Sequence, residues 1–143
     1  MDTSCSTHTL ALSAADRRRL LSARSLGAVA EELAATHLAR DHRLAVVARN
    51  WRIAEGELRG ELDVVAVEAA TNTLVVCEVK ARRDAARFGG AVAALGPTKT
   101  RRLRALTGAF LRTQPERFRA VRLDLVAIDL GRDARMTHIL EVA

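Results

Sequence analysis

The sequence is poor in the residues that mark several common classes of protein. Its two cysteines, Cys5 and Cys77, are too few for a disulfide framework and fit a reducing cytoplasm. No apolar run approaches the roughly 20 residues needed to cross a bilayer. Segment 1–12 has no basic start followed by an apolar stretch, so we expect no secretion signal. Aromatic residues make up only 3% of the chain, which argues against a surface that stacks bases.

Length and composition indicate one folded domain. The chain has 143 residues, of which 49% are hydrophobic and 28% charged, and a chain of this size can bury a real core. The small polar residues of segment 1–12 predict a flexible N-terminal tail, and we expect residues 13–143 to form a single domain.

Positive charge is concentrated in one stretch. Between Lys80 and Arg122 there are twelve lysine and arginine residues and two acidic ones, a net charge of +10, so the rest of the chain carries −4 of the total of +6. A polyanion would be drawn to this part of the molecule, as in proteins that neutralise phosphates. The alternative is that arginine is an ordinary solvated surface residue here, which explains the many arginines better than the scarcity of acids.

Hydrophobic periodicity predicts an α/β fold, with a mixed β-sheet flanked by helices. Apolar spacing indicates a helix from about residue 25 to 40, a short helix over 13–21, and a third that starts at Pro97 and ends near residue 112. The stretch 82–96 is predicted to be a loop. Five segments are typical of strands, namely 44–49, 61–67, 74–80, 121–130 and 137–142. The predicted order is α-β-β-β-α-β-β, with the last strand at an edge.

Four charged side chains converge if the second and third predicted strands form an antiparallel hairpin. Because side chains alternate along a strand, Asp63 is expected to share a face with Glu61 and Val65. A four-residue turn sets a register in which Asp63 lies opposite Glu78 and Glu61 lies opposite Lys80. Residues directly opposite each other are only about 4.5–5.5 Å apart at Cβ. The register therefore predicts a patch of three carboxylates and one ammonium group.

This patch has the composition of a metal site for phosphodiester hydrolysis. Carboxylates so close together repel each other unless a cation lies between them, and oxygen ligands suit Mg²⁺. Such an ion polarises phosphate and activates water, while Lys80 is placed to orient that water, take its proton or stabilise charge on the phosphate. The alternative is an exposed polar face with a cross-strand salt bridge. Glu78 favours the site, because it interrupts an apolar run in which a charge is costly.

Short motifs in this region occur in an order that resembles a known family. They are Arg49-Asn50-Trp51-Arg52, Gly60-Glu61-Leu62-Asp63 and Glu78-Val79-Lys80, followed by Lys99. Together they resemble the YraN-like bacterial family, which is similar to archaeal Holliday-junction resolvases within the PD-(D/E)XK, restriction-endonuclease-like superfamily. The resemblance covers residues 25–130 and implies a restriction-endonuclease-like core.

The resemblance also implies roles for individual residues. Glu31 matches the helix glutamate that resolvase-like members contribute to their site; Glu32 is a competing candidate, and an exposed helix acid is the alternative. Glu61 fits the family motif as a ligand or as a residue that supports one. The implied catalytic residues are Glu31, Asp63, Glu78 and Lys80. The implied ligands of Mg²⁺ or Mn²⁺ are Asp63, Glu78, Glu31 and Glu61.

Four basic residues are candidates for contacts with nucleic-acid phosphates. Lys99 matches a position of the family, and Arg82 closely follows the catalytic lysine. Arg101 and Arg102 lie on the polar side of the helix that starts at Pro97. For each residue the alternative is a solvated surface position or an ordinary ion pair.

The remaining titratable residues carry weaker signals. The sequence positions of the four histidines show no spacing typical of metal ligands. His37 falls on the apolar stripe of its helix, where a histidine is more often packed than metal-bound. Asp124 begins an apolar strand and is expected to pair with a basic residue inside the fold.

These patterns together predict a cytoplasmic, metal-dependent endonuclease that hydrolyses nucleic-acid phosphodiesters, with branched DNA among the candidate substrates. The alternative is a non-catalytic nucleic-acid-binding module that retains the nuclease fold. DNA is the expected partner, and no membrane partner is expected. Resolvase-like enzymes act as dimers, so a homodimer is a further expectation from the resemblance, although no segment of the sequence marks an interface.

Overall fold

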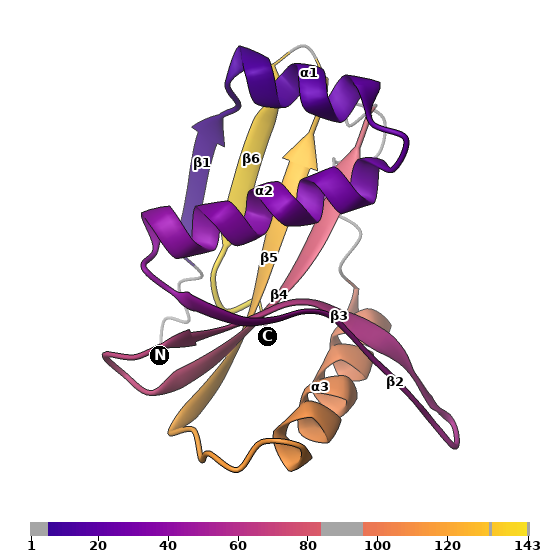
Figure 1. Ribbon diagram of the computed structural model, residues 1–143, viewed down its shortest axis with the longest axis vertical. Helices are drawn as coiled ribbons and strands as arrows, with labels where there is room; N and C mark the ends of the chain where they lie inside the picture. Colours follow the sequence, from indigo (N-terminus) through magenta and orange to yellow (C-terminus); the bar gives the residue numbers. More distant parts are fainter. Residues whose placement is uncertain (1–5, 84–95, 132, 143) are drawn as a thin grey trace.

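A six-stranded mixed sheet with helices on both faces forms the structure (Figure 1). The computed structural model describes residues 6–83, 96–131 and 133–142. The strands are β1 (Thr7–Ala11), β2 (Ala45–Glu55), β3 (Leu58–Glu68), β4 (Thr73–Arg82), β5 (Ala120–Asp129) and β6 (Arg135–Ile139). The helices are α1 (Ala14–Ser22), α2 (Leu26–Asp41) and α3 (Pro97–Arg112). The strand order is β1-β6-β5-β4-β3-β2, in which β4 and β5 are parallel and the other neighbours antiparallel.

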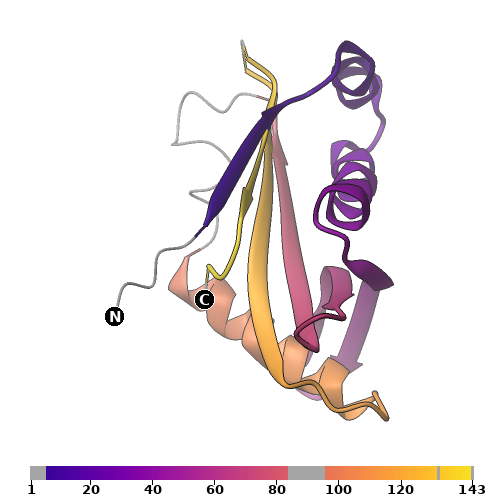
Figure 2. The same cartoon turned by 90° about the vertical axis from the view of Figure 1, so that its left-hand side faces the viewer.

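Each helix begins where the sequence supplies a start signal. The Ser13 hydroxyl accepts a hydrogen bond from the Asp16 N–H at 3.1 Å, and the Ser25 hydroxyl accepts one from the Ala28 N–H at 3.2 Å. Pro97 is the first residue of α3, where its missing N–H has no cost. Figure 2 shows α1 and α2 on one face of the sheet and α3 on the other. The prediction of a mixed sheet flanked by helices is confirmed.

Two hydrophobic clusters fix these helices on the sheet. The cluster beneath α1 and α2 includes Ala30, Leu38, Val64, Cys77 and Val126. The cluster beneath α3 includes Leu62, Val65, Val76, Leu106 and Phe110. Burial of apolar side chains on both faces of β4 and β5 explains the near-continuous apolar runs of these two strands.

The prediction of a flexible tail over 1–12 is wrong for the part that forms β1. Residues Thr7–Ala11 pair with β6 along the whole strand, so β1 is the edge of the sheet. The prediction that the last strand lies at an edge is therefore also wrong, because β6 is an inner strand. The sequence gives little sign of β1 because its side chains are almost all exposed. Pairing through the backbone needs no apolar pattern, and an edge strand with polar side chains resists aggregation.

The predicted hairpin register is confirmed over part of its length. Glu68 pairs with Thr73, and the ladder between β3 and β4 continues as far as the pair Val64–Cys77. It ends there, so the predicted pairs Asp63–Glu78 and Glu61–Lys80 do not form. In Figure 1 the ribbon of β2 and β3 runs across the lower end of the other strands, instead of continuing beside β4.

The alternation of side chains along β3 also breaks at Asp63. Val64 packs beneath α2, whereas Leu62 and Val65 both pack beneath α3. The expectation that Asp63 shares a face with Val65 is therefore wrong. On the neighbouring strand β2, Asn50 has a positive φ of 51°. It lies between Arg49, which pairs with Val64, and Trp51, which pairs with Leu62. Asparagine tolerates this left-handed conformation better than most residues, so this position of β2 permits the local twist.

The predicted loop 82–96 lies largely outside the described residues. At its two ends, Arg82 is the last residue of β4, and α3 begins at Pro97. None of the helices in the described part of the chain combines the length and the apolar character needed to cross a membrane.

Close packing between α3 and β3 makes Gly60→Ala a test of this arrangement. A Cβ at residue 60 would lie 2.9 Å from Cδ1 of Leu106, and the residue has a φ of +155°. Leu106 is only 2% exposed and cannot swing away freely. We expect Gly60→Ala to lower the free energy of unfolding by about 1–3 kcal/mol in urea denaturation. Gly27→Ala is the control, since no atom lies within 4 Å of its added Cβ. It should change stability by less than about 1 kcal/mol, and an equal loss in both variants would contradict the packing argument.

Candidate active site

A cleft opens where β3 leaves β4. Its volume is about 710 Å³. The helices α2 and α3 border it from opposite faces of the sheet, and the ends of β3 and β4 form its floor. Its charged lining residues are Glu31, Glu61, Asp63, Glu78, Lys80, Lys99 and Arg102. All four predicted catalytic residues and all four predicted metal ligands therefore line one cavity.

Asp63 takes over the backbone pairing that β3 no longer supplies. Its carboxylate oxygen Oδ2 accepts a hydrogen bond from the N–H of Val79 at 2.9 Å, two residues beyond the last ladder pair on β4. The side chain is held toward β4, and Asp63 is only 6% exposed. The carboxylate is thus fixed by the same break in the ladder that opens the cleft.

Three carboxylates gather on one side of this cleft. Oxygens of Glu31, Glu61 and Asp63 all lie within 4.8 Å of one another, an arrangement that could hold a metal ion. Glu31 comes from α2, as the family resemblance implied, and it is half-buried, whereas Glu32 is exposed and pairs with Arg19 at 3.0 Å. The structure therefore places Glu31, and not Glu32, in the cleft.

Glu78 has different partners from the other acids. The Nζ of Lys99 lies 2.9 Å from its Oε1, and the Nζ of Lys80 lies 3.5 Å from the same oxygen. Glu78 is only 5% exposed, whereas the side chains of both lysines are 34% exposed, so water is excluded from the carboxylate side of this contact only. Glu61, which was predicted to lie opposite Lys80, forms an ion pair with Arg52 instead, at 2.9 Å between Nε and Oε2.

The two residues that meet Glu78 are the only lysines in the sequence. The chain has 21 arginines and two lysines, Lys80 and Lys99. A preference for arginine as a general surface residue would have placed arginine here too. A lysine has a compact charge that loses its proton more readily, whereas arginine stays charged.

Crowding of the acids alters their protonation. Burial, and then the neighbouring charge of Glu78, raise the pKa of Asp63 to about 7 from a usual value of 3.8. Burial and the charge of Glu61 raise the pKa of Glu31, although contacts with Asn50 and Arg49 oppose the rise. Without a cation, ionising these carboxylates together is unfavourable.

The two lysines respond in opposite directions. Burial and the contact with Lys99 lower the pKa of Lys80, although the charge of Glu78 opposes the shift. Burial also disfavours the charged form of Lys99, but its contacts with Lys80 and Glu78 outweigh burial and raise its pKa. Lys80 is thus the lysine of the pair that gives up its proton more easily.

The predicted phosphate-contacting residues separate into two groups. Lys99 and Arg102 line the cleft, because they share one face of α3 with Leu103 and Leu106. Arg102 also donates a hydrogen bond through Nη2 to the backbone oxygen of Arg59. Arg82 and Arg101 are exposed and do not line the cleft.

Sequence reasoning missed two contributors to the site. Thr98 lines the cleft beside Lys99. Asn50 lies in β2, and its side chain opposes the rise in the pKa of Glu31. An asparagine in the sequence is a weak sign of a residue with positive φ, because asparagine is enriched in that conformation. No local sequence pattern indicates which distant acid lies near it.

The prediction for Asp124 is confirmed. The Arg122 guanidinium meets its two carboxylate oxygens at 2.8 and 3.0 Å, and Nε2 of His138 lies 2.8 Å from Oδ2. Burial disfavours the charged form of Asp124, but the hydrogen bonds from His138 and Arg122 outweigh burial and lower its pKa.

Fold and site together define a class: an α/β protein with a restriction-endonuclease-like core and a cleft of carboxylates and lysines. Comparison with known proteins then gives the family. Residues 30–128 match the model of the uncharacterised protein family UPF0102, and the chain belongs to this family. A UPF0102 protein of Mycobacterium ulcerans (strain Agy99) is 42% identical over 126 residues, which cover 87% of this chain and 98% of the relative. A UPF0102 protein of Mycolicibacterium gilvum (strain PYR-GCK) is 44% identical over 116 residues, covering 80% and 89%.

The raised pKa of Asp63 predicts a pH dependence of stability in metal-free protein. Folding favours the protonated carboxyl, so its contribution is complete below the unfolded pKa near 3.8 and is lost as the pH rises through about 7. Asp63→Asn keeps an acceptor for the Val79 N–H but cannot ionise. We therefore expect the free energy of unfolding of the wild type, relative to Asp63→Asn, to fall between pH 4 and 7 by on the order of a few kcal/mol.

The measurement is urea denaturation with a chelator at several pH values. Asp133→Asn is the control, because the Asp133 side chain is 79% exposed, and its difference from the wild type should not vary with pH. A constant difference between the wild type and Asp63→Asn would contradict the raised pKa.

Proposed function

We propose that this protein is a metal-dependent nuclease that hydrolyses phosphodiester bonds of nucleic acid in the cleft between α2 and α3. The observation that carries the proposal is the convergence of two groups of side chains in that cleft. Three carboxylates, from Glu31, Glu61 and Asp63, lie within 4.8 Å of one another. Beside them Glu78 contacts the ammonium groups of Lys80 and Lys99.

The donor set fits a hard divalent cation. Glu31, Glu61 and Asp63 offer only oxygen atoms, which suit Mg²⁺ and Mn²⁺. The raised pKa of Asp63 and that of Glu31 both reflect crowded, buried negative charge, which a bound cation would relieve. These three residues would hold the ion, with Glu78 next to it. When bound, the ion would polarise the phosphate and lower the pKa of a coordinated water.

The side chains of the protein account for the transfer of the proton. The lowered pKa of Lys80 favours its neutral amine, and this amine accepts a proton from the attacking water as the water oxygen forms a bond to phosphorus, so Lys80 becomes an ammonium group. The bond from phosphorus to the leaving sugar oxygen breaks, and that oxygen takes a proton from solvent. The products are a phosphomonoester and an alcohol. Glu78 holds the Lys80 ammonium at 3.5 Å and so positions the group that carries the proton.

The basic residues of α3 suit the substrate. Lys99 and Arg102 line the cleft and would hold phosphate oxygens. Both belong to the segment of net charge +10, which raises the local concentration of a polyanion. We propose DNA as the nucleic acid, in line with the family resemblance.

One observation supports a second candidate, a nucleic-acid-binding module without catalysis. Both lysines contact a single oxygen of Glu78, at 2.9 and 3.5 Å. A carboxylate held in this way is less free to bind a metal ion. In this candidate the cleft binds nucleic acid through its cations, and divalent metal has no effect.

Lysine-to-arginine substitution separates the two candidates. Labelled four-way junction, single-stranded and duplex DNA are incubated with Mg²⁺ or Mn²⁺, and cleavage is followed on denaturing gels. We expect Lys80→Arg to lower the cleavage rate by about 10²–10⁴-fold, because arginine keeps the charge but cannot take the proton. Glu78→Ala should lose cleavage as well. The control, Asp133→Asn, changes an exposed acid away from the cleft and should cleave like the wild type.

Binding of the same DNA is measured in parallel at several salt concentrations. The nuclease proposal requires metal-dependent cleavage that falls in Lys80→Arg while DNA binding is retained. Salt-sensitive binding without cleavage of any substrate, unchanged by divalent metal or by Glu78→Ala, would establish the binding module instead.

A further inference from the structure

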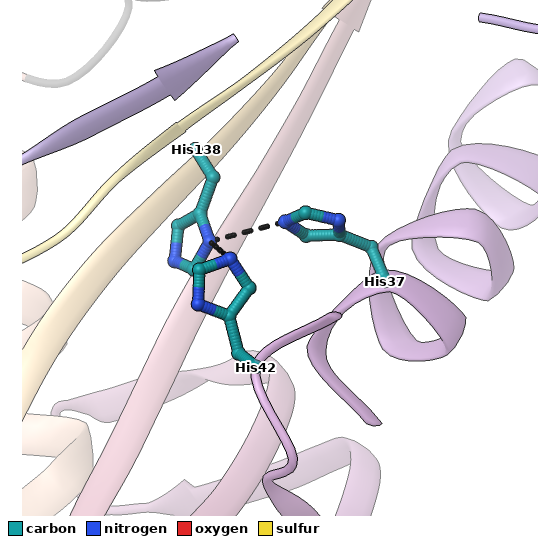
Figure 3. A group of neighbouring side chains, drawn as sticks. All are labelled: His37, His42 and His138. Atoms are coloured by element: carbon teal, nitrogen blue, oxygen red, sulfur yellow. Dashed lines mark hydrogen bonds between the residues drawn. The ribbon is translucent and has the colours of Figure 1, made fainter. Parts of the chain in front are cut away.

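All four histidines of the chain gather at one corner of the molecule, away from the carboxylate cleft. His8 lies on β1 and pairs with His138 on β6 in the antiparallel ladder. His37 lies in the last turns of α2, and His42 directly follows that helix. Figure 3 shows the rings of His37 and His42 turned toward that of His138. The sequence spacing predicted no such cluster, because its members come from three separate elements.

The nitrogen atoms at the centre of this cluster are spaced like metal ligands. Nε2 of His37 lies 3.2 Å from Nδ1 of His138, and Nε2 of His42 lies 3.3 Å from the same Nδ1. Two nitrogens bound to a tetrahedral Zn²⁺, each about 2.0–2.1 Å away, are about 3.3 Å apart. The ligand atoms of all three residues lie within 4.8 Å of one another. The remaining distance, between the ligand nitrogens of His37 and His42, would shorten by a small rotation of the His42 ring, which is only half-buried.

Outer hydrogen bonds orient two of the rings. Nδ1 of His37 lies 2.7 Å from a carboxylate oxygen of Asp41, and Nε2 of His138 lies 2.8 Å from Oδ2 of Asp124. A carboxylate only accepts hydrogen bonds, so each of these ring nitrogens carries the hydrogen. The inner nitrogens, Nε2 of His37 and Nδ1 of His138, are then left with lone pairs that face each other. A carboxylate behind a ligand histidine is the arrangement that fixes its tautomer in metal sites.

A network of neutral histidines leaves these lone pairs only partly satisfied. His42 can donate a hydrogen bond to Nδ1 of His138, which has one lone pair. Nε2 of His37 then faces the same atom without a hydrogen between them. A neutral imidazole nitrogen with a free lone pair is the form of histidine that binds metal ions.

The cluster is also accessible. A pocket of about 630 Å³ borders it and is lined by His8, His37, Asp41 and His42. The pocket provides an entry path and space for a fourth ligand. Imidazole nitrogens suit Zn²⁺ and related transition metals, and not Mg²⁺, so this corner differs in chemistry from the cleft.

We propose that His37, His42 and His138 form a Zn²⁺ site, with the fourth coordination position open to the pocket beside His8. The site joins the end of α2 to the inner strand β6. It is independent of the proposed nuclease function and of the carboxylate cleft.

The test is Zn²⁺ binding by the full-length chain, measured by competition with a chromophoric chelator. Co²⁺ serves as a spectroscopic probe, since tetrahedral coordination gives intense visible absorption bands. We expect one Zn²⁺ per chain, tetrahedral Co²⁺ bands and a rise in Tm with Zn²⁺. His42→Ala should weaken binding by more than the 10–100-fold that loss of an outer hydrogen-bond partner costs, and Asp41→Ala by about 10-fold.

Two matched variants show whether the metal sits at this corner. Thr36→Ala changes an exposed neutral residue next to His37, and Asp63→Asn alters the carboxylate cleft. Both should keep the tetrahedral Co²⁺ bands of the wild type. Circular dichroism checks that metal-free His42→Ala is folded, and the half-buried position of His42 favours this. His37→Ala is a second variant that removes a ligand. Absence of tetrahedral Co²⁺ bands, retained affinity in folded His42→Ala, or loss of these bands in Asp63→Asn would overturn the proposal.

Discussion

The separation of β3 from β4 is the constraint on which the carboxylate cleft depends. Up to Val64 and Cys77 the two strands exchange ladder hydrogen bonds. Beyond that pair, the N–H of Val79 would be left buried without a partner, and the Asp63 carboxylate satisfies it. An acidic side chain thus replaces a backbone acceptor, and its charge is placed where the sheet opens. The resulting burial, together with the charge of Glu78, raises the pKa of Asp63.

The cleft lies where three layers of the structure meet. Glu31 reaches it from α2 on one face of the sheet, and Lys99 reaches it from α3 on the other. The hydrophobic clusters beneath the two helices fix these approaches, so side chains far apart in the sequence hold stable positions. In a chain that otherwise uses arginine, lysine occurs only at the two positions that contact Glu78.

Helix α2 contributes a residue to the carboxylate cleft and another to the histidine corner. Glu31 and His37 are six residues apart, about 9 Å along the helix axis. The carboxylates of the cleft are hard oxygen donors, whereas the histidine corner offers nitrogen donors backed by Asp41 and Asp124. If both proposals hold, the cleft would take a hard divalent cation and the histidine corner Zn²⁺. An ion held at the histidine corner would also fix the end of the helix that carries Glu31.

The sequence by itself determined the helices and inner strands, the hairpin register near its turn, and the short list of cleft residues. Periodicity, helix caps and the charge of Glu78 within an apolar run are local signals, so they can be read along the chain. Only the tertiary structure decided that β3 leaves β4 before Asp63 and that residues 7–11 form an edge strand. It alone brought the four histidines together. These outcomes depend on twist and on pairing between distant segments, which leave no regular spacing in the sequence.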